Sequence, residues 1–291
     1  MVRKLFKHEF YAYLRILFPV WIIFSAVTLI ARMMQFLELP EGFLGIPQEL
    51  LDMYDVTVWV LNASAVAFYL AMALVCASLP LVLGIIRYYK NFFTGEGYLT
   101  FTLPATVGQH LFVKITTVLV LELLTFYLVF LSGCVVTSGS LLVEIVKALW
   151  YILVQQLKET GLHVPILFLQ MVVAVAVSAW VELLFYQHCL TVGQLFPKAR
   201  LLGAVGVYFG YYLLEQAVAT VGMVLFWLAM LFAIPILMAL PFAEALVGFI
   251  DQYYLYFMHL SIAFSTVISL LTGVFYYVVN YLIIRKRLNL E

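Results

Sequence analysis

Three acidic side chains lie inside long apolar stretches of the sequence, at Glu122, Glu182 and Glu215. A charged side chain at the centre of a bilayer costs about 2.5–3.5 kcal/mol or more, so such residues normally face protein or water. One interpretation is a proton relay or a polar cavity that faces a substrate. The other is a structural role, in which protonated or hydrogen-bonded carboxyl groups join helices. Both interpretations remain open at this point.

The sequence contains none of the short motifs that mark familiar catalytic sites. It has no G-x-x-x-x-G-K-[ST] phosphate-binding loop, no H-E-x-x-H and no G-x-S-x-G. The five histidines are far apart in the sequence, and we expect each to be an interfacial or hydrogen-bonded residue. Cys76, Cys134 and Cys189 lie in apolar runs and are expected to be small buried side chains. We therefore predict no catalytic residue, no metal site and no cofactor in this chain.

The composition of the chain predicts the helices that hold these residues in place. Of the 291 residues, 66% are hydrophobic and 10% are charged, against about 25% charged residues in soluble domains. Several apolar runs exceed the roughly 18 residues that a transmembrane helix needs. We predict an all-α polytopic membrane protein, with lipid as a partner, one transmembrane permease domain over residues 1–291 and no nucleotide-binding domain. The six expected spans are residues 16–37, 58–86, 110–135, 164–188, 201–229 and 261–284.

Three further segments have patterns of their own. Residues 3–15 alternate basic and apolar side chains at helical spacing, which favours an interfacial helix over a simple basic flank. Residues 141–160 form a second amphipathic pattern, expected to be an outer helix between spans three and four. Residues 230–260 are apolar but are interrupted by Pro235 and Pro241, which favours a re-entrant or interfacial excursion before the last span.

The basic residues predict the orientation of the chain. Cytoplasmic loops are enriched in Lys and Arg, and six spans place both termini on the basic side, facing the cytoplasm of a bacterial cytoplasmic membrane. A seventh span over residues 230–250 would place the basic C-terminus outside. The two sides divide as follows: Arg3, Lys4, Lys7, Arg15, Arg87, Lys90, Lys114, Lys198, Arg200, Arg285, Lys286 and Arg287 on one side, and Arg32, Lys147 and Lys158 on the other. The net charge of zero gives no sign of a nucleic-acid partner.

Residues 87–104 connect the second and third spans. Gly95 and Gly97 flank Glu96, and glycine tolerates the positive φ of a sharp reversal. The segment is also rich in Tyr and Phe. We expect a turn or a pair of short helices that docks another protein, rather than a solvated connector.

The fifth span contains a G-x-x-x-G pattern at Gly206 and Gly210. Small residues at this spacing let two helices approach closely. The contact is either within the chain or between two subunits, and it weakly favours a dimer.

Residues 87–104, with Gln109, His110 and Lys114, resemble the first cytoplasmic loop of ABC-2-type permeases. These are the membrane subunits of bacterial ATP-binding-cassette (ABC) exporters. A second fragment, Gly193 to Phe196 with Lys198 and Gly203, resembles the start of span five in the same family. The matched motifs cover about a sixth of the chain, and the layout of an interfacial helix, six spans and a late excursion agrees along all of it.

The resemblance implies a permease that works with two copies of a separate ATPase, which bind ATP and Mg. It also implies a second permease subunit, identical or related, and a peptide, lipid-like or drug-like amphipathic substrate. In such exporters the loop between spans two and three couples to the ATPase. Carried onto this sequence, the coupling residues are Arg87, Lys90, Asn91, Gly95, Glu96, Tyr98 and Phe101.

Two other classes of function remain open. An ion-coupled secondary transporter would use the three intramembrane glutamates, and inverted repeats, which we do not find, would support it. A membrane-embedded enzyme, or a sensor that holds a partner, would need convergent polar residues at one depth, and the sequence offers no convincing set.

Overall fold

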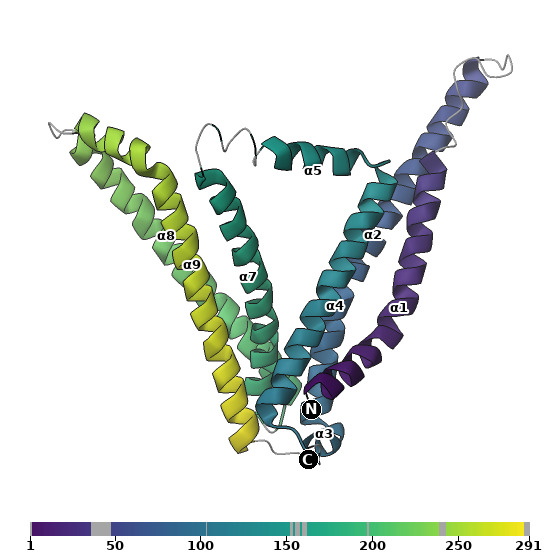
Figure 1. Cartoon of the computed structure of the whole chain (residues 1–291), viewed down its shortest axis with the longest axis vertical. Helices are drawn as coiled ribbons and strands as arrows, with labels where there is room; N and C mark the ends of the chain where they lie inside the picture. Colours follow the sequence, from purple (N-terminus) through teal and green to yellow (C-terminus); the bar gives the residue numbers. More distant parts are fainter. Residues whose placement is uncertain are drawn as a thin grey trace. The chain divides into compact units, whose positions relative to one another are not determined.

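The structure is a computed structural model that describes residues 2–35, 48–102, 104–151, 154, 158, 162–196, 198–238 and 243–287. Six long helices run through these residues (Figure 1): α1 (Val2–Met34), α2 (Gln48–Phe93), α4 (Val107–Val136), α7 (His163–Gly193), α8 (Arg200–Met238) and α9 (Ala243–Arg287). Two short helices, α3 (Glu96–Thr102) and α5 (Ser140–Trp150), lie between them along the chain. All six long helices are long and apolar enough to cross a membrane, which confirms a multi-pass helical membrane protein.

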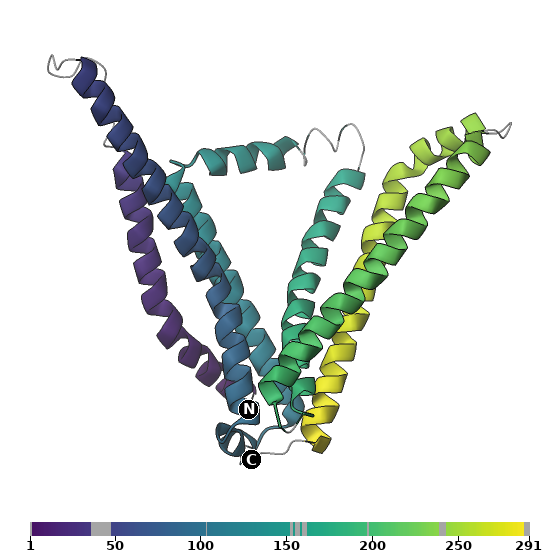
Figure 2. The same ribbon diagram turned by 180° about the vertical axis from the view of Figure 1, so that it is seen from behind.

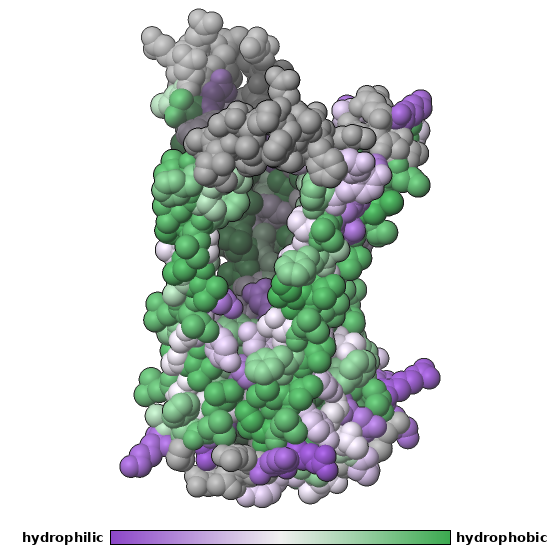
Figure 3. Space-filling model, turned by 90° about the vertical axis from the view of Figure 1, so that its left-hand side faces the viewer, coloured by the Kyte–Doolittle hydropathy of each residue, from purple (hydrophilic) through white to green (hydrophobic). Residues whose placement is uncertain are grey.

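Apolar side chains remain exposed along these helices, as expected where lipid replaces water. On the face drawn in Figure 3, hydrophobic side chains cover most of the helical surface, and hydrophilic ones gather toward its lower end. The 46 residues of α2 correspond to about 69 Å at 1.5 Å per residue, more than the roughly 30 Å hydrocarbon core. This helix therefore extends into the aqueous or headgroup region.

The chain divides into two compact units. Unit one comprises Met1–Tyr88 and Leu103–Tyr151, and unit two comprises Tyr89–Thr102 and Ile152–Glu291. Helix α2 belongs mostly to unit one, and its last turn belongs with α3 to unit two.

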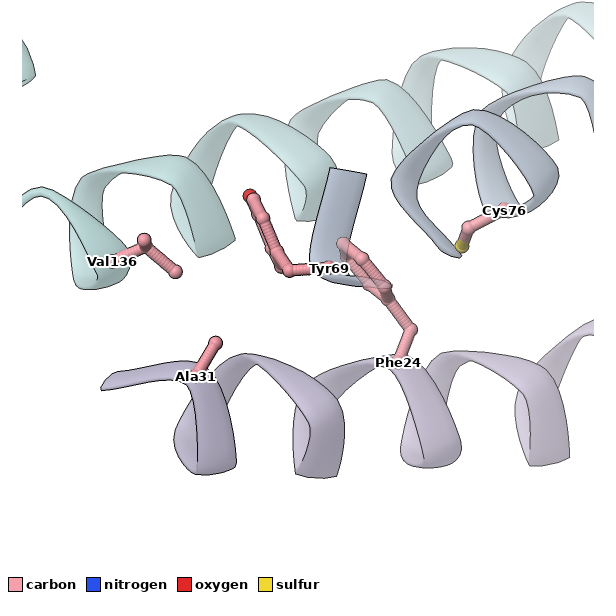
Figure 4. Packing of buried hydrophobic residues seen from close by; sticks show 5 residues of the cluster. All are labelled: Phe24, Ala31, Tyr69, Cys76 and Val136. Carbon is pink, nitrogen blue, oxygen red and sulfur yellow. The ribbon is translucent and has the colours of Figure 1, made fainter. Parts of the chain in front are cut away.

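In unit one, α1, α2 and α4 share a hydrophobic core. Phe24 and Ala31 of α1 meet Tyr69 and Cys76 of α2 and Val136 of α4 (Figure 4). The rings of Phe24 and Tyr69 stack with centroids 5.7 Å apart. The Tyr69 hydroxyl is also hydrogen-bonded to a Ser132 hydroxyl at 2.8 Å, so its polar end is satisfied within the core.

In unit two, α7 packs against both α8 and α9, which are drawn in green and yellow in Figure 2. An aromatic cluster joins the three helices: the ring of Phe185 lies 5.8 Å from the rings of Tyr208, Tyr211 and Tyr276. Two glycines permit close approach, because Gly193 faces the backbone of Ala204 and Gly273 faces Trp180.

The N-terminal amphipathic segment is not a separate helix. Helix α1 is continuous from Val2 to Met34 and contains Pro19. It changes direction in its N-terminal part (Figure 1). Proline removes one backbone hydrogen bond and clashes with the preceding turn, which accounts for a bend of this kind. The position of residues 3–15 at a membrane surface stays a prediction.

Two other predicted features are partly visible. Helix α5 covers the first half of the amphipathic segment 141–160 and buries none of its residues, while much of the second half lies outside the described residues. The excursion at residues 230–260 is helical on both sides, to Met238 and from Ala243. Residues 239–242 lie outside the described part, and re-entry into the membrane stays a prediction.

Candidate functional site

The segment predicted to dock a partner is a helix, a short turn and a second helix. Helix α2 ends at Phe93 and α3 begins at Glu96. The Gly97 N–H donates to the Thr94 carbonyl at 2.8 Å and closes the turn. Of the expected pair of short helices, α3 is present, whereas the residues before it form the end of the long helix α2. The positive φ that glycine would allow here is absent, because Gly139 is the glycine with positive φ among the described residues.

Aromatic packing holds α3 against the end of α2. Phe92 and Phe93 are buried, and the ring of Phe101 lies 5.7 Å from that of Phe92. Gly97 is buried on the same inner side of α3. The opposite side is open: Tyr98 is 57% exposed and Leu99 72% exposed.

We call the exposed residues Lys90, Glu96, Tyr98 and Leu99 the α3 surface. Of the predicted coupling residues, Lys90, Gly95, Glu96 and Tyr98 are exposed, while Asn91 and Phe101 are half-buried. Sequence reasoning missed Leu99, because a seven-residue helix is too short for hydrophobic periodicity to reveal its exposed side.

Arg87, the remaining predicted coupling residue, belongs to an ion-pair cluster in unit one. Its Nη2 lies 3.4 Å from Glu9 Oε2, and its guanidinium carbon lies 4.8 Å from the centre of the Tyr13 ring. Glu9 Oε1 accepts a hydrogen bond of 2.8 Å from Lys114 Nζ. The side chain of Lys114 is only 2% exposed, so this carboxylate joins α1, α2 and α4 through charge-assisted hydrogen bonds.

Arg87 and Lys114 were predicted to be basic flanking residues, and no role was predicted for Glu9. A signal was available. Glu9 shares one face of α1 with the buried residues Tyr13 and Leu17, and an acid among apolar positions at helical spacing indicates a buried partner.

The expected hydrogen-bonding role of the histidines is confirmed for three of them in unit two. His188 is hydrogen-bonded to Asn280 at 3.1 Å and to the Tyr211 hydroxyl at 3.2 Å. His163 Nδ1 lies 3.3 Å from His259 Nε2, although 96 residues separate the two in sequence. His259 Nδ1 in turn lies 2.8 Å from Gln170 Oε1.

The three intramembrane glutamates lie on three different helices. Glu122 is half-buried on α4 in unit one. Glu182 is exposed on α7 and accepts a hydrogen bond of 3.1 Å from Tyr186, one turn along the same helix. Glu215 is exposed on α8. In the described part of unit two, no hydrogen bond joins Glu182 to Glu215, so the geometry gives no direct proton path between them.

The glycine pair of the fifth span faces open space. A Cβ atom added at Gly206 or Gly210 would meet no atom within 4 Å. Within the described residues, this motif therefore makes no close contact with another helix of the same chain.

Comparison with known protein families, with curated proteins and with solved structures finds no match to this chain.

Proposed function

We propose that the chain is the permease subunit of an ATP-driven ABC exporter in a bacterial cytoplasmic membrane. The observation that carries the proposal is the α3 surface, in which Tyr98 and Leu99 are exposed on a short helix anchored by Phe92 and Phe101. Aromatic residues are enriched at protein interfaces, and an anchored helix that exposes Tyr98 and Leu99 suits a docking partner better than it suits water.

The continuity of α2 supplies a mechanism for coupling. This helix runs without interruption from Gln48 to Phe93, directly before α3. A movement imposed on α3 would therefore act directly on a continuous helix that is long enough to cross the membrane. In the proposed mechanism, ATP and Mg bind to the partner ATPase, and its closure shifts the permease between inward and outward access.

The proposal includes a second permease subunit, identical or related. Gly206 and Gly210 meet no atom of the described residues within 4 Å, which suits packing of this motif against another subunit. The substrate class is an amphipathic peptide, lipid-like or drug-like molecule, and both termini face the cytoplasm.

The proposal is tested by co-purification with an ATPase encoded beside this chain. We expect the wild type to retain the ATPase in detergent. The variant Tyr98→Ala/Leu99→Ser should retain at least about tenfold less, because truncating a hot-spot residue at the centre of an interface costs about 2 kcal/mol or more. Leu142→Ser/Tyr151→Ala is the matched control, since it changes exposed residues outside the α3 surface. Wild-type protein that retains no ATPase, or an α3 variant that retains it fully, would contradict the proposal.

A second candidate, an ion-coupled secondary transporter, is favoured by the exposed glutamates Glu182 and Glu215 within apolar helices. We expect the triple variant Glu122→Gln/Glu182→Gln/Glu215→Gln to keep its ATPase-dependent transport in vesicles within about twofold of the wild type. The reason is that the proposed exporter needs no proton carrier. Transport that a proton gradient drives without ATP, and that the triple variant abolishes, would replace the exporter proposal with this candidate.

A further inference from the structure

The N-terminal part of α1 carries a basic groove on its exposed side, which we call the α1 groove. It has a volume of about 740 Å³. Its main polar and aromatic lining is Lys4, Lys7, His8, Tyr11 and Arg15 of α1, with Arg87 of α2. The α1 residues recur every three or four positions, so they form one stripe along the helix.

The α1 groove is strongly cationic. Four of its lining side chains, those of Lys4, Lys7, Arg15 and Arg87, carry a positive charge, and no acidic residue lines it. The nearby Glu9 is on the buried face of α1 and is engaged by Lys114 at 2.8 Å. Its carboxylate therefore leaves most of the positive potential of the groove uncompensated.

Arg87 adds a guanidinium donor to the lining of the groove. Its Nη2 lies 3.4 Å from Glu9, but its buried Nε has no hydrogen-bond partner among the described residues. A buried donor without an acceptor costs about 1–3 kcal/mol. The Arg87 side chain as a whole is 25% exposed, so an anion bound in the groove would accept from the accessible part of its guanidinium, and guanidinium and ammonium groups together are the usual ligands of phosphate.

We propose that the α1 groove binds the phosphate of an anionic phospholipid headgroup. A lipid fits better than a soluble phosphate because the groove continues onto an apolar surface. Ile16 lines it, and Phe18 and Ile22 are 56% and 53% exposed further along the same helix. Cationic pockets beside transmembrane helices bind anionic headgroups in this way. This inference depends on α1 crossing the membrane and is independent of the exporter proposal.

Native mass spectrometry of the full-length protein in detergent tests the inference, with phosphatidylglycerol, phosphatidylcholine and inorganic phosphate as probes. We expect phosphatidylglycerol to bind and to resist displacement by millimolar phosphate, and phosphatidylcholine to bind at least about tenfold more weakly. The variant Lys4→Gln/Lys7→Gln/Arg15→Gln should lose at least about tenfold in phosphatidylglycerol affinity, since each cation near a headgroup contributes about 1 kcal/mol. These three side chains are exposed, so the fold should tolerate the change.

The matched control is Lys147→Gln/Lys198→Gln/Lys286→Gln, which removes three exposed cations outside the groove. It should bind phosphatidylglycerol like the wild type, and the melting temperatures of all three proteins should agree. If both variants lost the same affinity for phosphatidylglycerol, the binding would depend on surface charge in general, and the proposed site would be wrong. Displacement of lipid by inorganic phosphate at similar concentrations would assign the groove to a soluble phosphate compound and overturn the lipid assignment.

Discussion

Replacing Glu9 with Gln is expected to lower the free energy of unfolding by about 3–5 kcal/mol, the usual cost of removing one partner from a buried ion pair. The cause is the position of Lys114. Its side chain is 2% exposed, and its ammonium group lies 2.8 Å from the Glu9 carboxylate. Without that carboxylate, the ammonium remains away from water with its main compensating negative charge removed. Chemical denaturation in mixed micelles measures the loss.

The double variant Glu9→Gln/Lys114→Met tests whether charge is the reason. It removes the buried positive charge as well, and methionine keeps an unbranched apolar chain in its place, so most of the lost stability should return. Arg87 needs no matching change, because its side chain is 25% exposed and reaches solvent. A double variant as unstable as Glu9→Gln would mean that packing, not charge, explains the cost.

Glu144→Gln is the control for removing an acid as such. Glu144 is exposed on α5, and surface substitutions of this kind usually change stability by less than about 0.5 kcal/mol. If Glu144→Gln lost as much stability as Glu9→Gln, the assay would report net charge rather than the ion pairs of Glu9.

The long helices were predictable from sequence because hydropathy and length determine which segments suit a bilayer. Their ends were less predictable. The second span was predicted to begin at residue 58, whereas α2 begins at Gln48. Charged residues mark where a chain leaves the hydrocarbon core, but a helix satisfies its own backbone hydrogen bonds and continues into water.

The candidate sites were predictable only where they are local in sequence. The α3 surface lies within a few residues of one turn, and the sequence identified most of it. Glu9, in contrast, meets Arg87 and Lys114 at separations of 78 and 105 residues, and His163 meets His259 at 96. Helix packing alone decides such pairs, and no spacing rule within one helix encodes them.

Replacing Gly193 with Ala is expected to destabilise unit two by about 3 kcal/mol, the upper end of the usual cost of overpacking. The added Cβ would lie 2.5 Å from the backbone nitrogen of Ala204 and 2.7 Å from its Cα. Backbone atoms cannot rotate away as a side chain does. The turn between α7 and α8 is also fixed by hydrogen bonds from Phe196 N–H to the Gly193 carbonyl and from Gly203 N–H to the Ala199 carbonyl.

Substitutions at two other glycines allow the expected effects on stability to be ranked. Gly273→Ala should cost less than Gly193→Ala, because its Cβ would meet the outer ring atom Cζ3 of Trp180 at 2.6 Å, and a side chain is able to shift. Gly206→Ala should raise the free energy of unfolding by about 0.5–1 kcal/mol, because alanine favours a helix more than glycine does and the added Cβ meets no atom within 4 Å. Melting temperatures of the three variants at low protein concentration check the order. If Gly193→Ala were as stable as Gly206→Ala, the close packing of α7 against α8 would be refuted.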